Sequence, residues 1–484
     1  MDELKKANDF INENKIPKEE LPVFHAAPTV GWMNDPNGFS VYRGRAHLFY
    51  QHNPYSNAWG PMHWGHCVSD DFIKWESLPV AMAPDSNCDS GGCYSGSAVE
   101  TKQGHVLAYT GIMPKERGGK LIRLQNQCIA VGDGITYEKF PLNPVITGDM
   151  LPDGFSRTDF RDPKIFKEQD GYYMAVGNKT LDGIPQVVLF HSDDLKKWEY
   201  VSVLARDTER KLGTMWECPD FFSIGKQYML IISPMKLRAD EEFHNGNNSI
   251  CLIGDYDREK HKFDYGNAVL IDGGLDFYAP QTTLAPDGRR IMIGWMQSWD
   301  SNIRPANQKW ACMMTLPREL RVIDGQLIQN PVREIENYRT DPVICENEKI
   351  EGRRSFNGIN GRILDMTVEL ISGDCREFTV YFAQSERFQT SLTYRRDKNF
   401  LELDRTYCGM DRDAAAFRRV KIKNPKERIR LRFIMDKYSA EIFVNGGEQV
   451  LTSTFYTPLE ADGISFECDK PAQISITKYT IKVD

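Results

Sequence analysis

The sequence predicts an all-β protein with two domains, a five-bladed β-propeller followed by a β-sandwich. Three observations support this prediction: short alternating runs recur along the whole chain, segments of about sixty residues repeat five times, and the pattern changes after residue 330. The chain has 484 residues, 41% hydrophobic and 26% charged, which is an ordinary globular composition with room for two or three domains.

Residues 1–20 are predicted to form an N-terminal helical extension. Leu4, Ala7, Phe10 and Ile11 have the spacing of a short amphipathic helix, which should end before Pro17. This segment is charged and has no apolar signal-peptide core, so we expect a cytoplasmic protein.

Net charge and the distribution of cysteines indicate which binding partners and which cross-links are not expected. A net charge of −8 argues against nucleic acid or an anionic membrane, and no run of about 18 apolar residues exists. The eleven cysteines are scattered, so a disulfide framework is not expected. Cys88 and Cys93 are the closest pair, but no histidine or second cysteine pair stands nearby at zinc spacing, so we expect no metal.

Two series of repeats predict the propeller over residues 21–330. The segment SDDFIKWESLPVAM begins at Ser69 and SDDLKKWEYVSVL at Ser192, with weaker copies at Val131 and Ile253, in steps of 62, 61 and 61 residues. A second series marks strand starts in steps of 60, 67, 56 and 61 residues: Asn34, Tyr94, Arg161, Glu217 and Tyr278. Each unit has several short strands that bury their faces only against neighbouring units, as the blades of a propeller do.

The segment after residue 330 reads differently. Residues 331–345 are polar enough to be a linker, and from Lys349 runs such as EFTVYFAQ and SAEIFVNGG alternate well, with an Asn-Gly hairpin turn. We therefore predict a β-sandwich over residues 346–484, with an accessory role.

In this fold, motifs that precede the first strand of each unit meet at one end of the axis. Asp35, Asp162 and Glu217 would then share one site. Like charges resist being ionised together, so such a set is costly unless it is used. Hydrolysis of a glycosidic bond needs one carboxylate to attack and one carboxyl to protonate the leaving oxygen.

The three neighbourhoods predict different roles. Asp35 lies in an amide-rich turn whose hydrogen bonds should lower its pKa, which suits a nucleophile. Asp162 follows Arg161, whose guanidinium should keep it ionised, so it is suited to holding sugar hydroxyls. Glu217, between Trp216 and Cys218, has the apolar setting of an acid/base.

The motifs WMNDPNG, FRDP and WECPD resemble the three signatures of glycoside hydrolase family 32, which contains invertases, sucrose-6-phosphate hydrolases and fructan hydrolases. Further similar segments, including HLFYQHNP, YSGSAV and AEIFVNGGE, follow in family order over nearly the whole chain past residue 20. The resemblance makes Asp35 the nucleophile, Asp162 the transition-state stabiliser and Glu217 the acid/base. It also implies a set of residues around the fructosyl unit: Asn34, Asn37, Gln51, Trp59, Tyr94, Ser95 and Arg161, with Trp295 as a further wall.

The implied enzyme is a retaining β-fructofuranosidase that acts on sucrose and short fructo-oligosaccharides through a covalent fructosyl-Asp35 intermediate, without metal or organic cofactor. Its two catalytic carboxyls should lie about 5–5.5 Å apart. Sucrose-6-phosphate hydrolysis and fructosyl transfer are alternatives that use the same intermediate. A family 43 hydrolase shares the acid placement but not WMNDPNG with WECPD, and a non-catalytic sugar-binding propeller would not need the three acids.

The segment WDSNIRPANQKW departs from the pattern of many relatives. This loop, residues 299–309, is expected to shape the leaving-group side of the site, where Arg304 and Lys309 are candidates for a phosphate contact. The sequence leaves open the preferred substrate and whether the chain forms a homo-oligomer.

Overall fold

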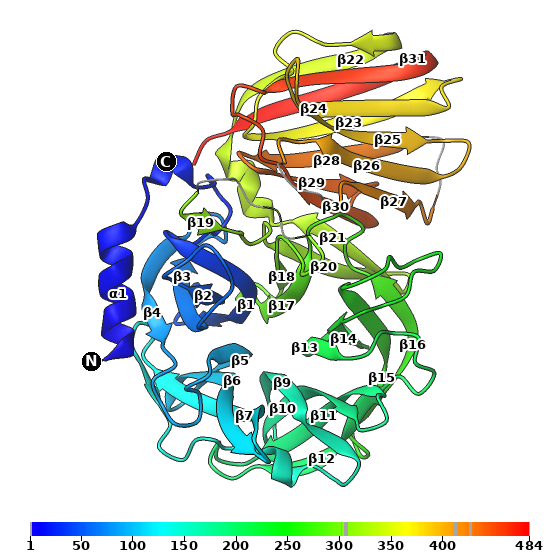
Figure 1. The fold of residues 1–484 in the computed structure, drawn as a ribbon. Coiled ribbons are helices and arrows are strands. Elements are labelled where there is room, and N and C mark those ends of the chain that lie inside the picture. Colours follow the sequence, from blue (N-terminus) through cyan, green and yellow to red (C-terminus); the bar gives the residue numbers. More distant parts are fainter. Residues whose placement is uncertain (1, 302, 304–307, 411–413, 425–427, 484) are drawn as a thin grey trace.

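The computed structural model describes residues 2–301, 303, 308–410, 414–424 and 428–483. Figure 1 shows a ring of small sheets with a second layered β-domain on one side of it. The predicted N-terminal helix is present as α1 (Glu3–Asn14), followed by the short η1 (Lys18–Glu20). Helix α1 lies against the first blade, where Asn8 Oδ1 accepts a hydrogen bond from Val80 N at 2.8 Å.

The ring is the predicted five-bladed propeller, with four antiparallel strands in each blade. The first blade contains β1 (Gly31–Tyr42), β2 (Arg45–Asn53), β3 (His63–Ser69) and β4 (Glu76–Met82). The second contains β5 (Cys93–Thr101), β6 (Gly104–Arg117), β7 (Lys120–Gly132) and β8 (Tyr137–Lys139), and is followed by η2 (Gly148–Met150). The third contains β9 (Phe155–Glu168), β10 (Gly171–Thr180), β11 (Pro185–Ser192) and β12 (Glu199–Arg206).

The fourth blade contains β13 (Trp216–Ile224), β14 (Gln227–Pro234), β15 (Ile250–Asp257) and β16 (Lys262–Leu270). The fifth contains β17 (Tyr278–Leu284), β18 (Arg290–Trp295), β20 (Arg318–Ile323) and β21 (Gln326–Pro331). Between β18 and β20, the short β19 (Trp310–Ala311) leaves the fifth blade and pairs in parallel with Gly31 and Trp32 at the start of β1. The last unit therefore contributes a strand to the first blade, which helps to close the ring.

Apolar side chains fill the spaces between neighbouring blades. Ala108 and Ile129 of the second blade pack with Phe160 and Met174 of the third, and Trp216 of the fourth blade packs with Leu189 of the third. All these side chains are buried. Each blade thus buries both faces against its neighbours, which is the physical reason for the repeat of about sixty residues.

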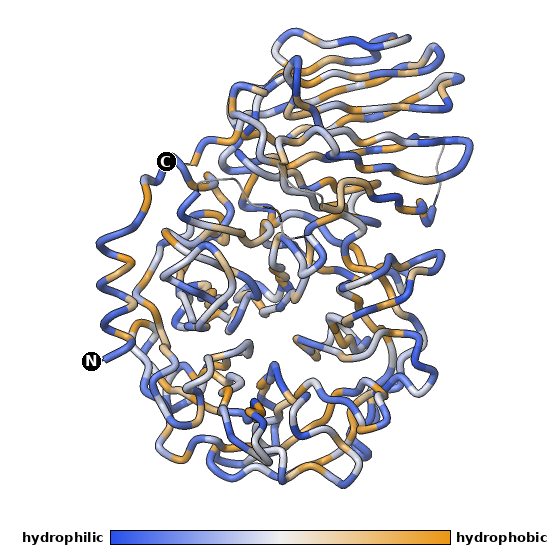
Figure 2. The backbone as a smooth tube through the Cα atoms, in the orientation of Figure 1, coloured by the Kyte–Doolittle hydropathy of each residue, from blue (hydrophilic) through white to orange (hydrophobic). Residues whose placement is uncertain are grey.

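The C-terminal domain is one continuous ten-stranded sheet folded into two arms. Its strands are β22 (Arg339–Arg354), β23 (Leu364–Gly373), β24 (Glu377–Gln384), β25 (Gln389–Arg395), β26 (Phe400–Tyr407), β27 (Phe417–Lys421), β28 (Ile429–Asp436), β29 (Ser439–Val444), β30 (Gln449–Thr454) and β31 (Gly463–Ile481). The long β31 pairs with β24 through its first half and with β23 through its second half. Side chains from both arms form one core, and Figure 2 shows hydrophobic and hydrophilic positions alternating along these strands.

The segment expected to link the domains, residues 331–345, is itself structured. The 3₁₀ helix η3 (Arg333–Tyr338) follows the last propeller strand directly, and β22 begins at Arg339. Strand β22 pairs with β31 alone and is therefore an edge strand. The polar residues of this segment lie on its solvent-facing side. The sandwich therefore begins before residue 346.

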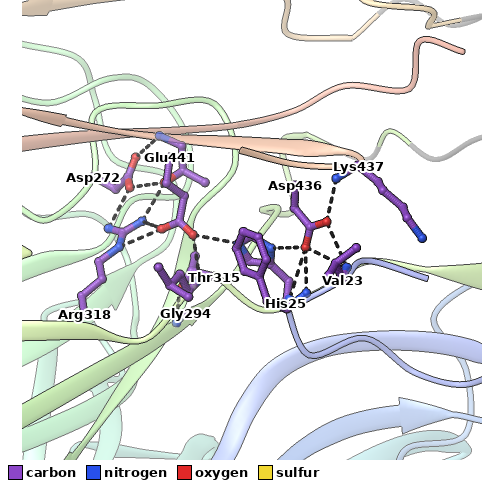
Figure 3. A network of polar contacts seen from close by, with 12 residues as sticks. Val23, His25, Asp272, Gly294, Thr315, Arg318, Asp436, Lys437 and Glu441 are labelled. Carbon is purple, nitrogen blue, oxygen red and sulfur yellow. Dashed lines mark hydrogen bonds and ion pairs between the residues drawn. The ribbon is translucent and has the colours of Figure 1, made fainter. Parts of the chain in front are cut away.

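A buried ionic cluster joins the two domains (Figure 3). Arg318 of β20 donates from Nη2 to Glu441 Oε2 at 2.6 Å and lies 3.0 Å from Asp272. His25 bridges Asp436 at 2.9 Å and Glu441 at 3.1 Å. Burial opposes the charge on His25, but its hydrogen bonds to the two carboxylates prevail and raise its pKa to about 9. The protonated imidazole and the guanidinium therefore balance acids that have no contact with water.

We expect His25→Gln to destabilise the protein by about 3–5 kcal/mol near pH 6, because the substitution leaves buried carboxylates without a charge partner. The His25 pKa rises from 6.5 to about 9 on folding. Its stabilising contribution is therefore complete below the unfolded-state value and is lost as the pH rises through the folded-state value. Urea unfolding of the wild-type protein and the variant between pH 6 and 10 measures this difference.

The gap between the two unfolding midpoints should narrow with rising pH. His191→Gln, on β11 and away from the interface, is the matched control and should show no such trend. A gap for His25→Gln that is constant across this range would contradict the charged state that we assign to His25.

Candidate active site

The five inner strands all lose regular pairing at the motif that the sequence singles out. In β1, β13 and β17 the pairing register shifts between Met33 and Pro36, between Glu217 and Asp220, and between Tyr278 and Gln281. In β5 the register shifts between Tyr94 and Gly96. The shift of β9 lies opposite residues Ala175 to Gly177 of its partner strand β10. A bulge turns the local side chains out of the regular alternation of a strand. At five equivalent positions, the bulges direct side chains to one end of the axis.

The backbone at these bulges takes conformations that most residues avoid. Asp162, Cys218 and Ala279 have φ angles of 66°, 47° and 51°. Each is followed by a proline, as is Asp35 of β1. An innermost strand has a free edge toward the axis, so a proline that lacks an N–H group is tolerated there. One prediction needs adjustment: β9 begins at Phe155, so Arg161 lies inside this strand and not at its start.

Asp35 is buried, and hydrogen bonds reach both of its carboxylate oxygens. Ser95 Oγ donates to Oδ2 at 2.6 Å, and Asn34 Nδ2 donates to Oδ1 at 3.1 Å. Asn34 is oriented in turn by Trp32, whose Nε1 donates to Asn34 Oδ1 at 2.8 Å. The first and second blades together fix the direction of this carboxylate.

Glu217 is held from two further blades. Arg161 of β9 donates to Oε1 from Nε at 3.1 Å and from Nη2 at 2.9 Å. Tyr278 of β17 donates from its hydroxyl to Oε2 at 2.7 Å. The predicted action of Arg161 on Asp162 is only part of its role: its guanidinium donates to Glu217, while its positive charge also favours the ionised form of Asp162. Glu217 therefore does not have the apolar setting that its neighbours in the sequence predicted.

Asp162 lies beside the other two carboxylates. The Cys218 N–H group donates to Asp162 Oδ2 at 3.0 Å, and Cys218 Sγ is 3.7 Å from both Asp162 Oδ2 and Asp35 Oδ2. Burial raises the pKa of the Cys218 thiol well above its usual value, so the sulfur remains a neutral donor between two acids. The structure thus brings together all three predicted carboxylates.

The electrostatics differ from the expectation for Asp35 and Asp162. Burial raises the pKa of Asp35 to about 6; the hydrogen bond from Ser95 opposes this shift, and the charge of Glu217 adds to it. Burial also raises the pKa of Asp162 to about 7, although Arg161 acts in the opposite direction. The predicted low pKa of Asp35 was wrong because loss of solvent outweighs the donors in its turn.

The other predicted residues surround this centre. Gln51 is buried and donates to Cys93 O at 2.9 Å. Asn37 is fully buried, and with its amide oxygen toward Gln51 it accepts from Gln51 N and Nε2, both at 3.0 Å. Trp59 is 44% exposed and meets the Tyr94 ring edge-on, with centroids 6.1 Å apart. Asn37 thus holds Gln51 in place, whereas Trp59 and Tyr94 form a partly exposed aromatic pair.

Sequence reasoning missed several residues here. Tyr278 was noted only as the start of a strand, although it holds Glu217. Gln125 of β7 accepts from Phe160 N at 2.9 Å and from Arg161 Nη1 at 3.4 Å, and no motif marks it. Trp295 is buried against Trp32 and Tyr278, while Trp299 packs on it and is 39% exposed. Of the two phosphate candidates, Arg304 lies outside the described residues and Lys309 is exposed.

Comparisons with known proteins identify the family of this chain. The model of the glycosyl hydrolases family 32 N-terminal domain matches residues 25–331, and that of the C-terminal domain matches residues 334–483. A sucrose-6-phosphate hydrolase and a raffinose invertase, both of Escherichia coli, are each 36% identical over 92% of this chain and 91% of their own length. The solved structure of a Bombyx mori GH32 β-fructofuranosidase variant in complex with sucrose is 31% identical, with a TM-score of 0.84 over 99% of this chain and 98% of that one.

The fold and the carboxylate set, together with these relatives, define a glycoside hydrolase. The chain belongs to glycosyl hydrolase family 32, as the motifs in its sequence implied.

If Asp35 reacts as an anion, kcat/KM for sucrose should fall at low pH with an apparent pKa of about 6. The sign follows from the chemistry, since a proton on Asp35 removes the electron pair that attacks. Ser95→Ala removes a hydrogen bond to the carboxylate. This variant should therefore raise the apparent pKa at which kcat/KM falls by about 1 unit. Steady-state kinetics between pH 4 and 8 measure the shift.

Ser202→Ala provides the matched control, because Ser202 donates to His261 O near the outer edge of its blade. This variant should keep the wild-type apparent pKa of kcat/KM. An apparent pKa that is unchanged or lower in Ser95→Ala would contradict the assigned hydrogen bond to Asp35.

Proposed function

We propose that this protein is a retaining β-fructofuranosidase that releases fructose from terminal non-reducing β-D-fructofuranosides, such as sucrose and short fructo-oligosaccharides. The observation that carries the proposal is the set of three carboxylates at one end of the axis, of which Asp35 and Asp162 are buried and Glu217 is half-buried. Family membership and the similarity to a structure solved with sucrose support the substrate class.

In this proposal Asp35 is the nucleophile. Its oxygen forms a bond to C2 of the fructosyl unit as the bond between C2 and the leaving oxygen breaks. Ser95 and Asn34 donate to the two carboxylate oxygens and hold them in one direction. A pKa of about 6 leaves most of Asp35 ionised at neutral pH, and the raised value keeps the anion reactive.

Glu217 is the proposed acid/base. In the first step its proton goes to the leaving oxygen. In the second step a water oxygen adds to C2, its proton returns to Glu217, and the bond between C2 and Asp35 breaks. Arg161 and Tyr278 hold the two oxygens of Glu217, so the carboxyl keeps one position in both steps. Arg161 also stabilises the anion that remains after the proton is delivered.

Asp162 is the proposed stabiliser of the transition state. Its Oδ2 accepts from Cys218 N at 3.0 Å, and Cys218 Sγ lies 3.7 Å from both this oxygen and Asp35 Oδ2. Hydrogen bonds from fructosyl hydroxyls to this carboxylate would strengthen as positive charge develops on the ring. Asn34, Gln51, Trp59, Tyr94, Ser95 and Arg161 are proposed to enclose the fructosyl unit, with Asn37 beneath them.

A second candidate substrate is sucrose 6-phosphate, because several relatives are sucrose-6-phosphate hydrolases. The cytoplasm is the compartment that we propose, since all eleven cysteines carry free thiols, as is common under reducing conditions. Within the residues that the structure describes, no helix has the length and apolar character needed to cross a bilayer.

Asp35→Ala and Glu217→Ala should each lower kcat for sucrose by at least about 10³-fold, the scale of losing a principal catalytic group. Asp153→Ala removes an exposed acid from the same propeller and should retain wild-type turnover. Fructose release by purified, folded variants is the measurement. Near-normal turnover in either site variant would refute the assigned roles.

Retention of configuration provides an independent test of the covalent intermediate. Two displacements at C2 should give the β-anomer of fructofuranose as the first product, which NMR detects before mutarotation. Inversion would exclude attack by Asp35. Analysis of the products at high sucrose concentration measures the ratio of hydrolysis to transfer. When a sugar hydroxyl instead of water attacks the fructosyl intermediate, the product is a kestose-type oligomer and not free fructose.

A further inference from the structure

Strand β9 of the third blade lies beside β7 of the second blade in the ring (Figure 1). As the innermost strand of its blade, β9 has an edge without a neighbouring strand, so its buried backbone groups there need other partners. Two side chains of β7 supply them: Phe160 N donates to Gln125 Oε1 at 2.9 Å, and Gln127 Nε2 donates to Phe160 O at 2.9 Å. Gln125 and Gln127 are two positions apart on β7 and therefore lie on one face of it.

A buried threonine completes these contacts. Thr110 Oγ1 of β6 donates to Gln127 Oε1 and accepts from Asp162 N, both at 2.9 Å. Thr110 and Gln127 are both fully buried. Side chains of the second blade therefore hold the peptide groups on either side of Arg161, and they fix the backbone that carries this arginine.

Gln125 also contacts the side chain of Arg161. Its Oε1 accepts from Arg161 Nη1 at 3.4 Å, while Nε and Nη2 of the same guanidinium donate to Glu217 Oε1 at 3.1 and 2.9 Å. Both partners of Gln125 Oε1 are N–H groups, so this atom is the acceptor oxygen of the amide. A guanidinium is planar and rigid, so an acceptor at Nη1 fixes the direction in which the other two donors point.

An acid competes for the same donor of Arg161. Asp159 Oδ1 lies 3.7 Å from Arg161 Nη1, and the Asp159 side chain is 30% exposed. Gln125 offers Nη1 a neutral acceptor instead, so the positive charge of the guanidinium is not drawn further toward a second anion. The amide of Gln125 thus supplies direction without taking charge from Glu217.

We propose that Gln125 is a positioning residue for the reaction: it keeps the guanidinium of Arg161 directed at Glu217 and leaves the charge of Arg161 to this acid/base. This inference rests on the proposed function and deepens it, because it assigns a residue that acts on proton transfer through Arg161. In the first step Glu217 gives its proton to the leaving oxygen, and an arginine already in place stabilises the carboxylate that remains. An arginine that turned toward Asp159 would stabilise it less.

The decisive experiment measures the pH dependence of kcat/KM for sucrose in the wild-type protein and in Gln125→Glu. The new carboxylate has nearly the same shape as the amide and still accepts from Phe160 N and from Arg161, but it adds a negative charge. Since Glu217 must carry its proton in the first step, kcat/KM falls on the alkaline side of the profile. The added charge opposes loss of that proton, so this fall should move upward by about 1 pH unit.

Gln125→Ala tests the effect on proton transfer with two leaving groups. Loss of the acceptor should lower kcat/KM about tenfold for sucrose, but by less than about threefold for 4-nitrophenyl β-D-fructofuranoside, whose nitrophenolate leaves without a proton. A substitution that only loosened the fold would lower both values equally. Adding Asp159→Asn to Gln125→Ala should recover part of the loss on sucrose, because it removes the charge that competes for Arg161 Nη1.

Gln449→Glu on β30 is the matched control for the added charge. Gln449 is half-buried like Gln125, and its Oε1 also accepts a backbone N–H group, that of Lys423 at 3.2 Å. This variant should keep the wild-type pH profile. Thermal unfolding of each purified variant establishes that the compared proteins are folded.

The outcomes distinguish the proposed function from the role of Gln125. Absence of fructose release from every fructoside by the wild-type protein would reject the proposed function. Active wild-type protein, together with an alkaline fall that is unchanged or lower in folded Gln125→Glu, would overturn only the role of Gln125. Equal losses on the two substrates in Gln125→Ala would do the same, because they would assign this residue to stability alone.

Discussion

The inner strands of the five blades surround one axis, and each belongs to a separate sheet, so they cannot share a backbone ladder. Side chains connect them instead. Ser97 of β5 joins Pro163 O and Ile165 N of β9, both at 2.7 Å. Lys164 joins Asp220 of β13 and Thr282 O of β17, each at 3.0 Å, and Gln281 reaches Gly96 O at 2.6 Å. These buried contacts fix the strands to one another at the positions where the bulges occur, and the geometry of the site depends on them.

The same arrangement explains how three acids can share a small volume. Loss of water and, to a smaller extent, mutual repulsion raise the pKa values of Asp35 and Asp162, which opposes folding at neutral pH. The opposing contributions come from Arg161, from neutral donors such as Ser95 and Tyr278, and from the packing between blades. A site built on five rigid strands can hold this unfavourable charge in place, whereas a flexible loop would move the acids apart.

The sandwich contributes no side chain to the contacts of the three carboxylates described here, yet it is part of the same folded unit. Glu441 of β29 accepts from Leu316 N and Arg318, residues of the fifth propeller unit, and Asp436 accepts from Val23 N near the start of the propeller. One domain thus holds the first and last parts of the ring, next to the place where β19 pairs with β1. A buried ionic contact is specific in geometry, so it also fixes the orientation of the two domains.

The sequence by itself determined the five-bladed ring, the second β-domain and the three carboxylates, because each is written in local patterns: the repeat of about sixty residues, the alternation of strands and the short acidic motifs. It did not determine the raised pKa of Asp35, the pairing of Arg161 with Glu217, or the contact of Tyr278 with Glu217. The linker predicted over residues 331–345 is instead η3 and the start of β22, because the polar face of an edge strand resembles a linker. Only the tertiary structure decided these features, since burial and contacts between side chains from different blades depend on how the blades close around the axis and not on neighbours in the chain.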